Sequence, residues 1–130
     1  MDRVFLDANV LFSAAYKENA RLLELWALKN VTLWSSRCAV EEARTNLPKE
    51  DQQRRLLELS QSLTLHEAGD CELPAGIQLH HKDLPILQAA IGARADYLLT
   101  GDIHHFGPYL RKTIAGVQIL VPAEYLEKQR

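Results

Sequence analysis

Two aspartates each follow a short apolar run, and this placement makes them candidates for chemistry. Asp7 ends the run over residues 4–6, and Asp102 comes shortly after the run over residues 97–99. Each run is typical of a buried strand, and in open α/β sheets ligands bind just beyond the carboxyl ends of the strands. Two carboxylates 4 Å apart repel each other by about 1 kcal/mol in water and about 4 kcal/mol near a protein surface. A divalent cation that offsets this repulsion is therefore expected at that edge.

Asp7 also fits other roles. An aspartate at the end of a strand is often a helix N-cap or a turn former. Asn9 is spaced so that both polar side chains can serve the same loop. A phosphatase of the haloacid-dehalogenase type also begins with a strand followed by Asp-x-Asp, but Asn9 stands at the second position here, which disfavours that interpretation. The chain has no Gly-rich phosphate loop and no nucleophile elbow.

Glu42 lies on a predicted helix over residues 37–46. The helix carries one apolar stripe, formed by Ala39, Val40, Ala43 and Leu47. At about 100° per residue, Glu42 lies about 60° from Ala39 and borders the buried face, whereas Glu41 lies farther toward solvent. Glu42 can therefore reach a cleft at the sheet edge. The alternative is that both glutamates are solvated or pair with Arg37, Arg44 or Thr45.

Asp83 stands before Pro85, so a helix is predicted to begin here. An aspartate N-cap ahead of a proline is common and needs no further function, which is the simpler interpretation. The two roles are compatible, because one carboxylate oxygen can cap the helix while the other reaches a cation.

Thr100 and Gly101 separate the second apolar run from Asp102. Glycine at this point permits a positive φ or a close approach of the backbone, and the Thr100 hydroxyl is expected beside the carboxylate. The histidines give a weaker signal, because neighbours in a regular element point in different directions and neither adjacent pair, 80–81 or 104–105, forms a two-histidine metal site. The pair at 80–81 is expected to be exposed, whereas the closeness of His105 to Asp102 leaves its role open.

The composition is that of an ordinary globular chain of 130 residues with a formal net charge of −2. One domain over residues 1–130 is expected. The chain has no run of Lys or Arg, so a nucleic-acid partner has to be held by a local basic patch. Cys38 and Cys71 are too few for a disulfide framework or a zinc site. No signal peptide and no apolar run of about 20 residues is recognisable, so a cytoplasmic protein without a membrane contact is expected.

Strand and helix patterns alternate along the chain, which is typical of an α/β fold with a parallel sheet and helices on both faces. The expected strands cover residues 3–6, 31–35, 63–66, 96–100 and 117–121. The expected helices cover residues 9–16, 20–29, 37–46, 50–63, 83–95 and 123–127. Residues 67–82 are expected to be irregular, and residues 104–111 to form a short helix or turn.

Taken in order, these segments resemble the PIN-domain family of metal-dependent ribonucleases, which includes VapC-like toxins of toxin–antitoxin pairs. The resemblance runs over nearly the whole chain and is strongest over residues 5–11 (FLDANVL) and over residues 82–90 (KDLPILQAA) running on to 95–102 (ADYLLTGD). Residues 42–47 (EARTNL) are similar to the family's acid-bearing helix. The resemblance implies a three-layer α/β/α sandwich whose sheet of about five parallel strands has the order 3-2-1-4-5.

The resemblance also implies which residues form the site. The acidic set is Asp7, Glu42, Asp83 and Asp102, supported by Asn9 and Thr100. Two positions depart from the family's pattern: Ala8 stands where many members have Thr or Ser, and His104 and His105 stand where many have a further acid. The second departure removes a carboxylate on which a second metal ion would depend.

The implied activity is hydrolysis of RNA phosphodiester bonds with Mg²⁺ or Mn²⁺, since oxygen ligands suit hard cations. Asp7 and Asp102 would contact the metal directly, and Glu42 and Asp83 would act through water or hold a second ion. The RNA backbone would be held by basic residues near the cleft, with candidates Arg37, Arg44, Lys82 and Arg111. A homodimer and an antitoxin partner are implied as well. The alternatives are a PIN-like RNA- or protein-binding module without cleavage, and a phosphatase on a similar sheet.

Overall fold

A central sheet of six strands organises the described part of the chain. The computed structural model describes residues 1–67, 75–81 and 83–129. Cys71, Lys82 and part of the predicted irregular segment therefore lie outside the described residues. The strands are β1 (Asp2–Leu6), β2 (Val31–Ser35), β3 (Thr64–Leu65), β4 (Tyr97–Leu99), β5 (Thr113–Ile114) and β6 (Val117–Leu120). Their order across the sheet is β3-β2-β1-β4-β6-β5.

Five of these strands are parallel and confirm the predicted order. β3, β2, β1, β4 and β6 pair in parallel, with β6 as the last of the five. The sequence pattern does not predict β5, which pairs antiparallel with β6. Ala115 and Gly116 join the two strands with positive φ values of 49° and 87°. Two consecutive positive φ values are typical of a type I′ hairpin turn, and this turn adds a sixth strand at one edge.

The helical elements follow the predicted positions, and two of them are 3₁₀-helices. They are α1 (Ala8–Tyr16), η1 (Arg21–Ala27), α2 (Arg37–Asn46), α3 (Glu50–Ser60), α4 (Leu84–Gly92), η2 (Gly107–Tyr109) and α5 (Pro122–Lys128). η1 lies within the helical stretch predicted over residues 20–29, but it is a 3₁₀-helix of seven residues. Its first and last turns carry hydrogen bonds from the Leu23 N–H to the Ala20 carbonyl and from the Leu28 N–H to the Leu25 carbonyl. A 3₁₀-helix has about 3.0 residues per turn and an α-helix about 3.6. The spacing of apolar residues over seven positions is too short to tell the two apart.

A sharp turn connects α4 to β4 and shortens the helix relative to the prediction. Arg94 has a positive φ of 55°. Its N–H donates to the Ile91 carbonyl and the Ala95 N–H donates to the Ala90 carbonyl, each at 3.0 Å. This pair of bonds is a Schellman motif. It ends α4 at Gly92 rather than at residue 95, and it leads the chain directly into β4.

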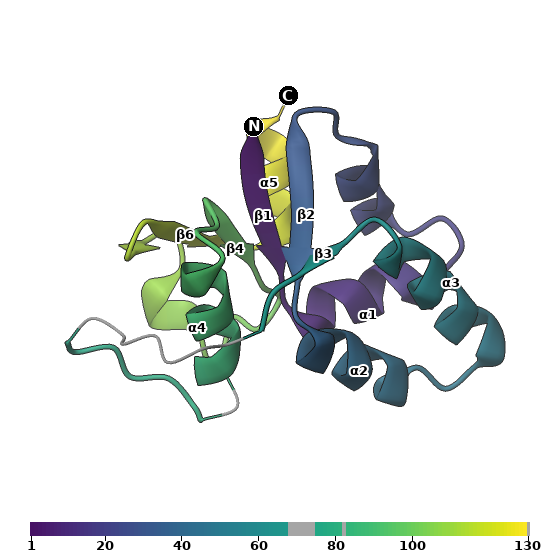
Figure 1. Ribbon diagram of the computed structural model, residues 1–130, viewed down its shortest axis with the longest axis horizontal. Coiled ribbons are helices and arrows are strands. Elements are labelled where there is room, and N and C mark those ends of the chain that lie inside the picture. The colour runs from purple at the N-terminus through teal and green to yellow at the C-terminus, as the bar shows by residue number, and fades with distance from the viewer. Residues whose placement is uncertain (68–74, 82, 130) are drawn as a thin grey trace.

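The helices flank the strands, as Figure 1 shows: in that view α1, α2 and α3 lie to one side of β1 and β2, and α4 lies to the other. α1 packs against α2, α3 and η1, and α5 packs against η1. No helix in the described ranges is both long enough and apolar enough to cross a bilayer. The core runs through β1, whose residues Val4, Phe5 and Leu6 are fully buried. The residue that follows Leu6 therefore has a fixed position.

Candidate metal centre

The carboxyl ends of β1 and β4 lie side by side and bring two candidate segments to one edge of the sheet. Leu6 of β1 is in register with Leu99 of β4, and the Asp7 N–H donates to the Leu99 carbonyl at 3.1 Å. Asp7 and Thr100 therefore leave the sheet together. In Figure 1 this is the lower end of β1, opposite the end at which the two termini lie.

Asp7 is buried, and both of its carboxylate oxygens accept hydrogen bonds from the protein. Oδ1 accepts from the Ala8 N–H at 2.7 Å and so caps α1. Oδ2 accepts from the Thr100 hydroxyl at 2.8 Å and from the Asn9 amide at 3.4 Å. The N-cap role that the sequence offered as an alternative is therefore real, and it leaves the remaining lone pairs of the carboxylate for other contacts.

The environment of Asp7 works against its negative charge. Burial is the main reason that the pKa of Asp7 rises to about 6, and the charges of Asp83 and Glu42 act in the same direction. The hydrogen bonds from Thr100 and Ala8 lower the pKa only in part. A cation beside these carboxylates would favour the ionised form of Asp7 and offset the repulsion among them.

Thr100 connects Asp7 to Asp102 through a single buried hydroxyl. Thr100 is fully buried, and its Oγ1 donates to Asp7 and accepts from the Asp102 N–H at 3.0 Å. The Gly101 N–H donates to Asn9 Oδ1 at 2.8 Å. A Cβ on Gly101 would lie 3.3 Å from that same oxygen. Of the two reasons for glycine weighed from the sequence, the close approach therefore applies, and Asn9 and Thr100 both hold the loop that carries Asp102.

A compact group of potential metal ligands consists of Asp83, Asp102 and His105, with one atom of each within 4.8 Å of the others. His105 Nδ1 lies 2.8 Å from Asp83 Oδ2 and 2.9 Å from Asp102 Oδ2, but neither contact has hydrogen-bond geometry. Nδ1 and Asp83 Oδ2 are buried atoms without a hydrogen-bond partner among the described residues. Such atoms are rare in native proteins, and a divalent cation would give each of them a partner. The donor set fits a metal ion.

Asp83 does not cap α4 with its side chain, although it occupies the N-cap position. Its backbone is helical, with φ −96° and ψ −14°, and the side chain makes no capping hydrogen bond. The backbone N–H of Asp83 donates instead to the His80 carbonyl at 2.8 Å. The simpler interpretation from the sequence therefore does not account for the carboxylate, which is directed at His105.

Glu42 and Glu41 have different surroundings on α2. Glu42 is exposed and, together with Asp7, lines a cavity of about 90 Å³. Glu41 is exposed as well, but its carboxylate forms an ion pair with Arg44 at 2.7 Å. The alternative in which a glutamate pairs with a neighbouring arginine therefore holds for Glu41, and Glu42 is near enough to Asp7 for its charge to raise the pKa of that carboxyl.

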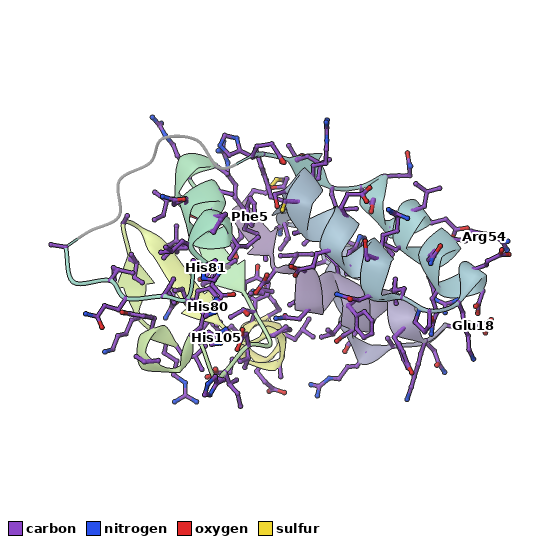
Figure 2. The ribbon with its side chains drawn as sticks, turned by 90° about the horizontal axis from the view of Figure 1, so that it is seen from below. Phe5, Glu18, Arg54, His80, His81 and His105 are labelled. Carbon is purple, nitrogen blue, oxygen red and sulfur yellow. The ribbon has the colours of Figure 1, made fainter. Side chains whose placement is uncertain are left out.

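Sequence patterns missed one residue near the site, Glu67, and assigned no role to another, His105. Glu67 lines the same cavity as Asp7, and its two carboxylate oxygens accept from the Arg37 N–H at 3.0 and 2.8 Å. His105 was left open, although its place three residues after Asp102 was the available signal. His80 is exposed as expected, but its ring stacks on that of His105 with centroids 4.9 Å apart. Figure 2 shows these two histidines together, far from Arg54 at the other end of the molecule.

The fold and this arrangement agree with comparisons to known proteins. A family model described as the PIN domain matches residues 3–104. The chain belongs to the PIN-domain family. Members of this family are in general metal-dependent nucleases, and this member carries a group of acidic side chains that could hold a metal ion.

A solved structure shares the PIN fold. It is the VapBC2 complex from Rickettsia felis bound to a DNA fragment from its promoter, and one of its chains superposes with a TM-score of 0.62 at 22% sequence identity. The match covers 90% of this PIN-domain chain and 96% of the other. No curated protein matches the sequence significantly.

Proposed function

We propose that this PIN-domain protein is a ribonuclease that depends on Mg²⁺ or Mn²⁺ and hydrolyses RNA phosphodiester bonds. The observation that carries the proposal is the gathering of Asp7, Asp83 and Asp102 where β1 and β4 end, with Thr100 and His105 between them. Carboxylate oxygens of Asp83 and Asp102 lie within 4.8 Å of each other, and a cation between them would offset their repulsion.

Asp83 and Asp102 are the best-placed carboxylates to hold the ion. Asp102 uses Oδ1 to accept from the His105 N–H at 3.0 Å, which leaves Oδ2 directed at the group. A carboxylate offers about four acceptor sites, so Asp7 can join the ligand set while it keeps its bonds to Ala8 and Thr100. A bound divalent ion activates water for attack and offsets charge on the scissile phosphate. To Glu42, which is exposed and lines the same cavity as Asp7, we assign the role of taking the proton of the attacking water.

RNA is proposed as the substrate because the chain belongs to the PIN-domain family. The surroundings of the basic residues indicate which of them could bind the RNA backbone. Arg44 and Arg111 form ion pairs with Glu41 and Glu124. Arg37 is exposed at the start of α2, between two residues that line the cavity. We assign Arg37 as the first contact for a substrate phosphate, with Lys82 outside the described residues.

A toxin role and its partners belong to the same proposal. The structural neighbour comes from a VapBC complex bound to promoter DNA, which supports an antitoxin as a protein partner. A homodimer is proposed on the resemblance to VapC-like proteins alone. Co-expression with the product of an adjacent gene for a small DNA-binding protein, followed by co-purification, tests the partner directly.

The activity is tested on purified protein with single-stranded RNA. We expect cleavage with Mn²⁺ or Mg²⁺ and none with EDTA. Glu42→Gln should lower cleavage strongly, whereas Glu41→Gln, the adjacent position on the same helix, should cut at the parent rate. Intact RNA together with rapid hydrolysis of a small phosphate monoester would favour the phosphatase. Binding of RNA without any cleavage in either metal would favour the inactive module.

A further inference from the structure

His105 is the one side chain in the group with Asp83 and Asp102 that offers a nitrogen rather than a carboxylate oxygen. We propose that its Nδ1 is a direct ligand of the bound cation, so that the site prefers a first-row transition ion such as Mn²⁺ over Mg²⁺. The inference rests on the proposed metal dependence and adds the identity of a nitrogen ligand. It assigns His105 to metal binding rather than to packing.

The distances fit neighbouring ligands of one ion. Adjacent ligands of an octahedral cation with bonds of about 2.0–2.1 Å lie about 2.9 Å apart. His105 Nδ1 is 2.8 Å from one carboxylate oxygen and 2.9 Å from the other. A hydrogen bond would give similar distances, but neither contact has hydrogen-bond geometry, and Nδ1 and Asp83 Oδ2 have no other partner in the described ranges. Ligation by one cation accounts for both distances and for both buried atoms.

The ring of His105 is held in this direction by its surroundings. The backbone N–H of His105 donates to Asp102 Oδ1 and closes the loop. The other oxygen of the same carboxylate, Oδ2, lies 2.9 Å from His105 Nδ1. The His80 ring stacks on it nearly parallel, with planes 7° apart. Phe106, the next residue, is fully buried and anchors the loop in the core. A ligand that is positioned in advance loses little freedom when the ion binds.

A nitrogen ligand changes which ion the site favours. Mg²⁺ is a hard cation that is usually bound through oxygen, whereas imidazole suits transition ions, and affinity for such sites rises along the series that starts at Mn²⁺. Asp83 and Asp102 alone would suit either ion. With His105 as a third ligand, the site should bind Mn²⁺ more tightly than Mg²⁺.

Pulsed electron paramagnetic resonance of the metal-stripped protein loaded with Mn²⁺ tests the assignment without relying on activity. We expect the echo to be modulated by a directly bound nitrogen in the parent and in His104→Gln, an exposed neighbour in the same loop, and not in His105→Gln. Mn²⁺ affinity, measured by calorimetry, should fall about tenfold or more in His105→Gln, and Mg²⁺ affinity should fall less. His105→Asp should lose the nitrogen signal and shift the preference toward Mg²⁺.

Each other result overturns the assignment in a distinguishable way. Tight Mn²⁺ binding by the parent without nitrogen modulation removes His105 from the ligand set and leaves the proposed nuclease intact. Loss of the signal in His104→Gln but not in His105→Gln identifies the wrong histidine. Failure of the folded parent to bind either ion removes the metal site and, with it, the metal-dependent activity.

Discussion

Both ends of the β1–β4 pair carry aspartates, but the two ends hold them differently. At the amino ends, Asp96 accepts from the Arg3 N–H and Asp2 accepts from the buried Tyr125 hydroxyl, each at 2.8 Å. Each of those carboxylates has a neutral donor from a different part of the chain and ties that part to the sheet. At the carboxyl ends, Asp83 and Asp102 each direct an oxygen at the same nitrogen of His105, and burial raises the pKa of the neighbouring Asp7. Folding accounts for the first arrangement, whereas in the second the burial of Asp7 works against its charge, which is typical of a functional site.

Matched aspartate-to-asparagine substitutions at the two ends of β4 should differ most in their effect on RNA cleavage. Asp102→Asn removes one of the charges that would hold the metal, so we expect kcat/KM for RNA cleavage with Mn²⁺ to fall about a thousandfold, equivalent to about 4 kcal/mol. Asp96→Asn keeps an oxygen for the Arg3 N–H and should cut at the parent rate. If both variants cleave alike, the two ends of the strand do not differ in the way proposed.

Asp7→Asn should sharpen the comparison through stability. The pKa of Asp7 is about 6 in the folded protein against 3.8 for the ordinary group, so the folded state binds the proton more tightly. The favourable contribution is present below pH 3.8 and is lost as the pH rises through 6. In EDTA at pH 7, the variant should therefore be more stable than the parent by at most about 3 kcal/mol.

The same variant separates a metal ligand from a cap. Urea unfolding of parent and Asp7→Asn between pH 4 and 8 measures the difference, which should shrink toward low pH. Cleavage of RNA by the variant should fall by orders of magnitude. A variant that melts like the parent at every pH and still cuts RNA would remove Asp7 from the active site, since asparagine also caps helices well.

Metal addition should stabilise only a chain whose carboxyl-end acids are intact. At a free Mn²⁺ concentration about 100 times the Kd, the free energy of unfolding of the parent should rise by about 2.7 kcal/mol. Asp96→Asn should keep this rise and Asp102→Asn should lose it. Thermal melts with and without Mn²⁺ measure the effect, and an equal shift in both variants would mean that the ion binds elsewhere.

Tyr125→Phe at the amino ends should give the smallest effect. The change removes the hydrogen bond to Asp2, whose carboxylate is partly exposed and can bind water instead. We expect a loss of about 1 kcal/mol in unfolding free energy and unchanged RNA cleavage. Asp2→Asn, which keeps an acceptor for the Tyr125 hydroxyl, is the matched control. If Tyr125→Phe is fully folded under the assay conditions and still cleaves RNA more slowly than the parent, the amino ends of the strands also contribute to activity, which contradicts the proposal.

Much of the fold was predictable because apolar runs and turn residues act locally. The runs at residues 4–6 and 97–99 are strands, as predicted, and all of their residues except the partly buried Tyr97 are buried. The helix over residues 37–46 has the predicted bounds. β5 was not predictable, because it has two residues and an Ala-Gly turn, which lacks the asparagine or aspartate that usually marks a type I′ hairpin. The strand order itself came from the resemblance, since pairing between distant segments has no local signature.

The candidate site was only partly predictable, for a similar reason. The positions of Asp7 and Asp102 follow from strand ends, but the direction of a side chain depends on what packs around it. The sequence favoured a capping role for Asp83, and the structure turns its carboxylate toward His105. The closeness of His105 to Asp102 in the sequence left its role open, because only the folded turn, closed by the hydrogen bond from the His105 N–H to Asp102, shows that its ring points back toward that carboxylate.

The shared hydroxyl of Thr100 turns one backbone amide into a reporter for nuclear magnetic resonance. The Asp102 N–H donates to Thr100 Oγ1, and that oxygen in turn donates its own proton to Asp7. A proton or an ion that arrives at Asp7 changes the polarisation of the hydroxyl, and the neighbouring amide senses this change. The amide chemical shift of residue 102 should therefore follow the charge state of a carboxylate that it does not touch, in the unmodified protein and without a probe.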